Sequence, residues 1–200
     1  MENAMITINE ITITRDGREI IYDYSEQIPA GSITVIIGPN GSGKSTLLAA
    51  IAGDIVPSKG TITIDELHPP LTSAKELAKL RAMAMQNQFY TLGFSVRQII
   101  EMAGSAQEVM DQLHLTHIAE RPVTTLSGGE SQRVAIAQAI AQKTPVLLLD
   151  EPFAAQDVDS RKRIINLLKS LAEGGTTVVV VAHSSEIDLA WADKIIKDFA

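Results

Sequence analysis

The sequence predicts an α/β fold with a parallel central sheet, a small N-terminal antiparallel β-subdomain and a short inserted helical subdomain. Two continuous apolar runs, TPVLLLD (144–150) and TTVVVVAH (176–183), indicate strands that are covered on both faces, as in parallel sheets. Helical patterns at 130–142 and 160–171 lie beside them in the chain. This alternation is typical of α/β proteins, and 200 residues fit one domain over 1–200.

The first thirty residues predict the antiparallel part. Short apolar alternations lie on either side of Asp16 and Gly17. This dipeptide suits a two-residue hairpin turn, because glycine tolerates the positive φ that such turns require. We therefore expect residues 1–30 to form a small antiparallel sheet.

The middle of the chain predicts a strand, two helices and an insertion. The β-branched run SITVIIG is typical of a strand and ends in a glycine-rich loop, after which 45–53 continue as a helix. Ser73 and Glu76 have the spacing of a capping box and predict a helix through about Leu80. A mainly helical segment, about 87–126, is inserted between sheet elements.

The composition limits the classes of function. Asp and Glu total 24 against 17 Lys and Arg, a net charge of −7, so we expect no nucleic-acid partner, which would need a broad basic surface. Cysteine is absent, which excludes disulfides and thiolate metal sites, and we expect His114 and His117 to be solvated. The N-terminal residues lack a signal-peptide pattern, and no apolar run approaches the ~20 residues of a membrane span, so we expect a cytoplasmic protein.

The segment GPNGSGKST has the composition of a phosphate-binding loop. Gly38, Gly41 and Gly43 allow the backbone to curl so that N–H groups point inward, and the following helix adds the positive end of its dipole. We expect Lys44 to supply charge for the β and γ phosphates of a nucleotide, and Ser45 to ligate Mg²⁺. A chance glycine-rich turn is the alternative, but the strand before the loop and the helix after it disfavour that interpretation.

The run VLLLDEP ends a predicted buried strand with two acids, Asp150 and Glu151. The carboxyl ends of strands in open α/β sheets are where ligands bind. We expect Asp150 to hold Mg²⁺ and Glu151 to polarise the attacking water. Two acids at a strand end are usually only solvated, so this interpretation depends on the upstream phosphate loop.

A second glycine-containing segment, TTLSGGESQRV (124–134), precedes a helical run. A helix that begins near Gly129 offers free N–H groups and a positive dipole end to a phosphate, and Ser127 adds a hydroxyl donor. An ordinary N-capped helix explains the serine but not two glycines. The sequence therefore predicts a second phosphate-binding turn.

Four motifs in this order, GPNGSGKST, LSGGESQRV, VLLLDEP and VVVVAH, resemble the nucleotide-binding subunit of ABC transporters over nearly the whole chain. The resemblance implies a P-loop NTPase core that binds ATP with Mg²⁺ and hydrolyses it. It also implies that the turn of Ser127, Gly128 and Gly129 faces ATP bound by a second copy. The ATPase would then act as a homodimer, or as a heterodimer with a related ATPase.

The resemblance also assigns site residues by position. Gln86 matches the glutamine that senses Mg²⁺ and links the site to the transmembrane partner, with Gln88 as the other candidate. Asp157 matches the acid of the loop facing the opposite subunit, and His183 matches the histidine that contacts the γ phosphate. The expected catalytic residues are Glu151, His183, Lys44 and Gln86. The expected metal ligands are Ser45, Gln86 and Asp150. The expected nucleotide-binding residues are Gly38, Pro39, Asn40, Gly41, Ser42, Gly43, Lys44, Ser45, Thr46, Arg15, Ser127, Gly128, Gly129, Glu130 and Asp157.

Three features depart from the family. Arg15 lies in the first hairpin, where an aromatic residue usually stacks on adenine, although arginine can also stack on a π face. Gln156 stands where leucine is common, which leaves the dimer-facing loop open in detail. The helical segment is short, and we expect no regulatory tail after Ala200.

Aromatic and apolar residues gather after the glutamine, at Phe89, Tyr90, Leu92 and Phe94. They indicate either core packing or an exposed groove for a helix of a membrane partner. This stretch is most similar to ATPases of siderophore, haem and cobalamin importers. That similarity implies separate transmembrane permease subunits, a solute-binding protein as a further candidate partner, and a location at the inner face of the cell membrane.

Other classes of protein share parts of this pattern. A soluble ABC ATPase of cofactor assembly or DNA maintenance has the same ATP motifs, although a DNA role usually brings a long coiled coil, which is absent. A binding module that never hydrolyses ATP is disfavoured by the presence of Glu151 and His183. A small-molecule kinase has no use for LSGGE. We therefore favour a transport ATPase, with the cargo and the direction of transport left open.

Overall fold

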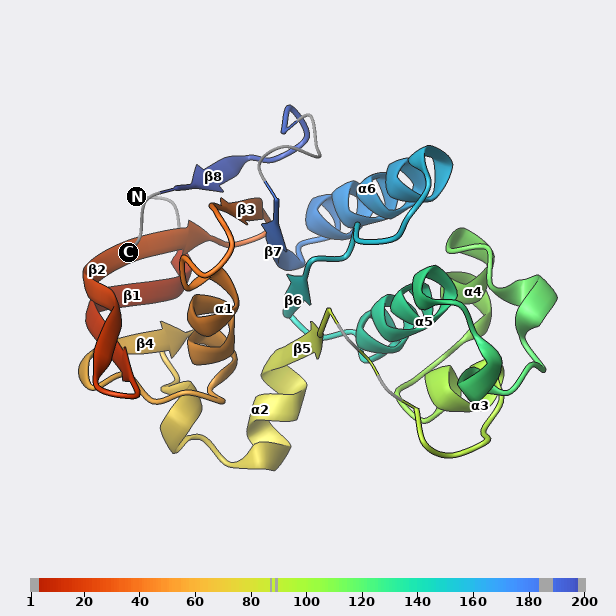
Figure 1. Cartoon of the computed structure of the whole chain (residues 1–200), viewed down its shortest axis with the longest axis horizontal. Coiled ribbons are helices and arrows are strands. Elements are labelled where there is room, and N and C mark those ends of the chain that lie inside the picture. The colour runs from red at the N-terminus through yellow and green to blue at the C-terminus, as the bar shows by residue number, and fades with distance from the viewer. Residues whose placement is uncertain (1–3, 87, 89, 184–188, 198–200) are drawn as a thin grey trace.

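A five-stranded parallel sheet forms the centre of the protein (Figure 1). The computed structural model describes residues 4–86, 88, 90–183 and 189–197. The strand order is β5-β6-β7-β3-β8, and each neighbouring pair runs parallel. The strands are β3 (Ile33–Ile37), β5 (Arg81–Ala84), β6 (Val146–Asp150), β7 (Thr177–Ala182) and β8 (Lys194–Ile196).

A three-stranded antiparallel sheet lies to one side of this core. Its order is β2-β1-β4, from the strands β1 (Ala4–Arg15), β2 (Arg18–Pro29) and β4 (Lys59–Ile64). Asp16 and Gly17 join β1 to β2 with φ angles of 51° and 76°, the two positive values of a type I′ turn. The hairpin therefore forms at the predicted dipeptide.

Helices cover both faces of the parallel sheet. On the face toward the antiparallel sheet lie α1 (Lys44–Ala52) and α2 (Ala74–Leu80). On the other face lie α3 (Val96–Glu101), α4 (Gln107–Gln112), α5 (Gly128–Ala141) and α6 (Val158–Glu173). Figure 1 shows α3, α4 and α5 as a group on the side opposite the antiparallel sheet. Within the described ranges, none of the helices combines the length and apolar character needed to cross a membrane.

Successive side chains of the parallel strands enter two separate cores. In β3, Val35 belongs to the core under α3 to α6, whereas Ile36 belongs to the core under α1 and the antiparallel sheet. In β6, Leu147 likewise belongs to the core under α3 to α6, and Leu148 belongs to the core under α1 and the antiparallel sheet. Because both faces are buried, these strands appear in the sequence as unbroken apolar runs.

The register of the sheet brings three loops to one edge. Ile37 of β3 pairs with Ala182 of β7, and Asp150 of β6 pairs with Val181 of β7. The chain therefore leaves all three strands at the same level, at their carboxyl ends. This edge is where α/β sheets of this kind bind ligands.

The predicted fold class is confirmed. The helices expected at 45–53, 130–142 and 160–171 begin and end within two residues of α1, α5 and α6. Three strands were not predicted, namely β4, β5 and β8. They are short, with six, four and three residues, so that local periodicity gives little signal.

Gly60 allows β4 to approach β1 where their pairing is irregular. Its φ is +73°, and a Cβ there would lie 2.3 Å from the carbonyl oxygens of Asn9 and Glu10. We predict that Gly60→Ala lowers the free energy of unfolding by at least about 1 kcal/mol, because both the left-handed backbone and the clash disfavour a side chain. Thermal unfolding measures the effect, with Gly93→Ala as the control, since a Cβ at Gly93 meets nothing within 4 Å. Equal melting temperatures for the two variants would contradict this explanation.

Candidate functional site

The loop after β3 buries a lysine among backbone oxygens. Lys44 is only 5% exposed, and its Nζ donates hydrogen bonds of 2.9 Å to the carbonyl oxygens of Gly38 and Pro39. Neutral carbonyls compensate a buried ammonium only in part, and a buried charge is best stabilised by an opposite charge. The loop is therefore suited to an anion beside Lys44.

The backbone of this loop has the curled form that phosphate binding requires. Gly41 and Gly43 have φ angles of 80° and 91°, and Gly43 is the N-cap of α1. A Cβ at Gly43 would lie 2.9 Å from the side chain of Ile20, so β2 packs directly against the loop. The buried hydroxyl of Ser42 has no hydrogen-bond partner among the described residues. An incoming phosphate oxygen would satisfy both this hydroxyl and the free N–H groups of the first helical turn.

A hydrogen bond connects this loop to β6. The Ser45 hydroxyl donates to Asp150 Oδ1 at 3.1 Å, and Asp150 is 7% exposed. Burial raises the pKa of the Asp150 carboxyl above its usual range, and the hydrogen bond from Ser45 partly offsets this effect. A hydroxyl and a carboxylate at this distance are hard oxygen ligands suited to Mg²⁺.

Glu151 lies between two polar side chains from other loops. Gln86 Nε2 donates to Glu151 Oε2 at 2.7 Å, and His183 Nε2 lies 3.2 Å from Glu151 Oε1. The backbone of Glu151 has a φ of 48°, a left-handed value that is uncommon for a residue with a side chain. Both carboxylate oxygens are thus held in a defined direction at the edge of the sheet.

One cavity of about 510 Å³ brings most of the predicted residues together. Its wall contains the glycine-rich loop, Glu151 with its two polar neighbours, and the end of the first hairpin. The lining residues are Arg15, Ile20, Asn40, Gly41, Gly43, Lys44, Ser45, Thr46, Gln86, Glu151 and His183. Ile20 was not predicted, because an isoleucine in a hairpin gives no signal apart from core packing.

Of the two candidate glutamines, the geometry of the cavity favours Gln86. Gln86 lines the cavity and contacts Glu151, as given above. Gln88 instead accepts a hydrogen bond of 3.3 Å from the Ser131 hydroxyl through its backbone carbonyl. The geometry therefore agrees with the match of Gln86 that the resemblance implies.

The second glycine turn lies outside the lining of this cavity. Ser127 is the N-cap of α5, and its hydroxyl accepts from Glu130 N while Glu130 Oε2 accepts from Ser127 N, a complete capping box. Glu130 was predicted to bind nucleotide, but its carboxylate is engaged within its own turn. The turn itself is exposed at Ser127 and Gly128.

The two glycines of this turn have different surroundings. A Cβ at Gly129 would lie 2.7 Å from the carbonyl oxygen of Ala155, so packing within the chain explains this glycine. A Cβ at Gly128 would meet nothing within 4 Å. The sequence argument that both glycines serve a phosphate therefore needs refinement, because only Gly128 lacks an explanation inside its own chain.

Gln156 connects the turn to the loop that follows Glu151. Its side chain is buried, donates to the Gly129 carbonyl at 3.0 Å and accepts from Arg133 Nη1 at 2.8 Å. The sequence identified this residue only as a departure from leucine. Asp157, the next residue, is exposed and caps α6 by accepting from Ser160 N at 2.6 Å.

The apolar cluster after Gln86 divides between core and surface. Tyr90 packs against the core, and burial raises its pKa to about 12. Leu92 is 63% exposed and Phe94 is 36% exposed, and Met85 and Met102 are exposed as well. Phe89, also predicted to belong to this cluster, lies outside the described residues. Tyr90 therefore fits the core-packing alternative, and the groove for a membrane partner stays a prediction for the exposed Leu92 and Phe94.

Comparison with known proteins identifies the family. The model of the ABC transporter family matches residues 21–154. The chain belongs to the ABC transporter family. It is an ATP-binding and ATP-hydrolysing subunit of the ABC ATPase type.

The relatives of this ABC ATPase include importers and dimeric cassettes. It is 40% identical to the hemin import ATP-binding protein of Rhodococcus jostii, over 93% of this chain and 68% of that protein. It is 34% identical to the cobalamin import ATP-binding protein of Halobacterium salinarum, over 96% of this chain and 52% of that protein. A solved dimeric bacterial ABC transporter cassette superimposes with a TM-score of 0.83 at 28% identity, over 96% of this chain and 93% of that chain. That cassette also has a solved dimeric post-hydrolysis state bound to ADP and Pi.

Asp150 gives the nucleotide-free ATPase a pH-dependent stability. Its pKa is raised in the folded state, so its ionised form opposes folding at neutral pH, and this cost disappears as pH falls through the native pKa. We predict that Asp150→Asn raises the melting temperature at neutral pH, and that its advantage over the wild type vanishes on acidification. Thermal unfolding as a function of pH measures both effects.

Asp157→Asn is the matched control, because its hydrogen bonds with Ser160 lower the pKa of Asp157. The charge of Asp157 stabilises the folded state above its unfolded pKa, and this contribution is lost as pH falls through the lowered native pKa. Asp157→Asn should therefore be less stable than the wild type at neutral pH. A pH-independent advantage of Asp150→Asn, or equal signs for both variants, would contradict the role of burial.

Proposed function

We propose that two copies of this ATPase, or one copy and a related ATPase, enclose two ATP molecules between them. Each nucleotide would contact Lys44 and the glycine-rich loop of one chain and the Ser127 to Gly129 turn of the other. The absence of this turn from the lining of the 510 Å³ cavity supports the proposal, because one chain alone surrounds the phosphates incompletely. The open surroundings of Gly128 support it too, since they leave room for a second molecule.

Within each site, Glu151 orients the attacking water and accepts its proton. The contacts with Gln86 and His183 fix the direction of the carboxylate, so that little reorganisation accompanies the reaction. Lys44 and the loop N–H groups stabilise the charge on the phosphoryl oxygens as the bond to the leaving group lengthens. His183 is suited to contact the γ phosphate, since it lies in the same wall as Lys44.

The residues at the end of β6 fit Mg²⁺. Ser45 and Asp150 supply a hydroxyl and a carboxylate oxygen that are already 3.1 Å apart. The amide nitrogen of Gln86 donates to Glu151, so its oxygen remains available as a third ligand. When bound, the metal would neutralise charge on the phosphates during hydrolysis.

Arg15 is proposed to contact the base of the nucleotide. It lies in the wall of the cavity at the end of β1, directly before the turn at Asp16 and Gly17. Its guanidinium plane can stack on a purine face, which would replace the aromatic residue usual in the family.

We also propose that this ATPase drives import through separate permease subunits, which hold it at the inner face of the membrane. The exposed apolar side chains of Met85, Leu92, Phe94 and Met102 support a docking surface for such subunits. The similarity to importers supports the direction of transport, and the 40% identity with a hemin import protein favours a large metal chelate as cargo. A soluble role in cofactor assembly is disfavoured by the same relatives. A solute-binding protein would complete the system.

We predict that Glu151→Gln retains ATP binding but lowers the hydrolysis rate by at least about a hundredfold, because the amide cannot act as a base. Its ATP-bound form should be a dimer of twice the 21.5 kDa chain mass. Phosphate release and light scattering with Mg²⁺ and ATP measure the two effects. Lys44→Ala is the control, which should neither bind ATP nor dimerise.

Full hydrolysis by Glu151→Gln would refute the role of Glu151. A monomer at saturating ATP, seen for Glu151→Gln and the wild type alike, would refute a site built from two copies of this chain.

A further inference from the structure

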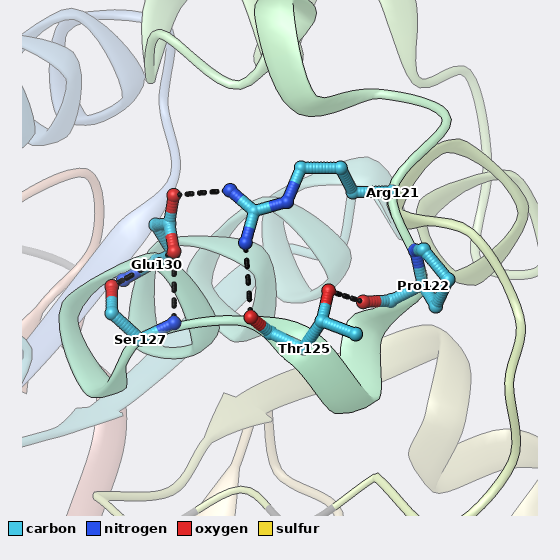
Figure 2. Close-up of polar contacts among 5 residues, drawn as sticks. All are labelled: Arg121, Pro122, Thr125, Ser127 and Glu130. Atoms are coloured by element: carbon cyan, nitrogen blue, oxygen red, sulfur yellow. Dashed lines mark hydrogen bonds and ion pairs between the residues drawn. The ribbon is translucent and has the colours of Figure 1, made fainter.

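Arg121 lies before the second glycine turn in the chain and forms hydrogen bonds to residues on either side of that turn (Figure 2). Its Nη1 donates to Glu130 Oε1 at 2.9 Å, and its Nη2 donates to the carbonyl oxygen of Thr125 at 2.9 Å. Nothing in the sequence distinguished this arginine from any other surface cation. The two bonds use two arms of one planar group, a geometry that lysine cannot reproduce.

The charge of Glu130 makes this contact relevant to ATP. Its side chain is 19% exposed and lies in the first turn of α5. There the negative carboxylate offsets the positive end of the helix dipole. The hydrogen bond from the Ser127 backbone is the largest cause of a lowered pKa for Glu130, so the group is ionised at neutral pH. A lone carboxylate here would repel the phosphates of an approaching nucleotide. The guanidinium of Arg121 offsets that charge.

The backbone of Arg121 is tied to the segment that follows the apolar cluster. Val96 N donates to the Arg121 carbonyl at 3.0 Å, and Val123 N donates to the Phe94 carbonyl at 2.9 Å. Ser95 and Pro122 form an isolated bridge between these two bonds. The residue that contacts the glycine turn is thus also fixed to the segment with the exposed Phe94.

We propose that Arg121 is a positioning residue for the ATPase reaction. It offsets the charge of Glu130 so that the Ser127 to Gly129 turn attracts the γ phosphate of ATP bound by the partner chain. This inference rests on the two-chain site proposed above.

The test measures ATP binding and ATP-induced dimerisation separately. In the Glu151→Gln background, Arg121→Gln should leave the Kd for ATP unchanged, because the chain's own cavity is intact. The dimerisation constant should weaken about tenfold, since a hydrogen bond to a charged group is lost and a carboxylate is exposed. With Glu151 present, kcat should fall by a similar factor. Melting temperatures show whether each variant is folded.

Two further variants separate a charge effect from a purely structural one. Arg121→Gln combined with Glu130→Gln removes the uncompensated carboxylate while keeping a capping-box side chain, so dimerisation should recover most of the loss. Arg97→Gln is the matched control. Arg97 Nε donates to Glu120 Oε1 at the same 2.9 Å in the same helical group, but no described contact joins it to the turn, so dimerisation should be unchanged.

Each outcome decides a different point. If the double variant Arg121→Gln, Glu151→Gln dimerises as strongly as Glu151→Gln alone, the role proposed for Arg121 is wrong. The two-chain site is then unaffected. A loss that the added Glu130→Gln fails to recover overturns the charge mechanism. A Glu151→Gln chain that stays monomeric with ATP overturns the two-chain site, and this inference with it.

Discussion

The parallel register of β3, β6 and β7 is the constraint on which the site depends. Because Ile37, Asp150 and two successive residues of β7 are paired across the sheet, three loops emerge at one level. The loops deliver a buried lysine, two acids and a histidine from three segments, the first of which lies more than a hundred residues before the other two. The hydrophobic cores on both faces of the sheet keep this register rigid. The polar groups at the edge therefore have little freedom to move relative to one another.

The same edge of the sheet also limits which residues of one chain can line its own cavity. Lys44 and Glu151 line the cavity, but the turn at Ser127 caps α5, in the helical group on the side opposite the antiparallel sheet, and is not part of the lining. Arg121 and Gln156 hold that turn from two directions, through Glu130 and through the Gly129 carbonyl. The proposed second chain would explain a turn that is held in this way but does not line the cavity of its own chain.

Most of the fold, and most of the residues that line the cavity at the edge of the sheet, could be predicted from local patterns. Apolar runs, glycine spacing and acids at a strand end are properties of contiguous residues, so they identified β3, β6, β7, α1, α5 and the residues around Lys44 and Glu151. The contacts of Arg121, Gln156 and Ile20 could not be predicted in this way. They join segments through single side chains, and neither residue type nor periodicity distinguishes them from ordinary surface or core positions.

Complementation between two inactive chains tests the central claim, that each active site is built from two copies, most directly. Lys44→Ala disables the phosphate loop, and Gly128→Asp adds a carboxylate to the turn where a Cβ meets nothing of its own chain. Each variant alone should lack ATPase activity. An equal mixture should recover activity in proportion to the mixed dimers that form, because each mixed dimer contains one intact site, built from Lys44 of the Gly128→Asp chain and Gly128 of the Lys44→Ala chain. A mixture as inactive as its components, although mixed dimers form, would contradict the account.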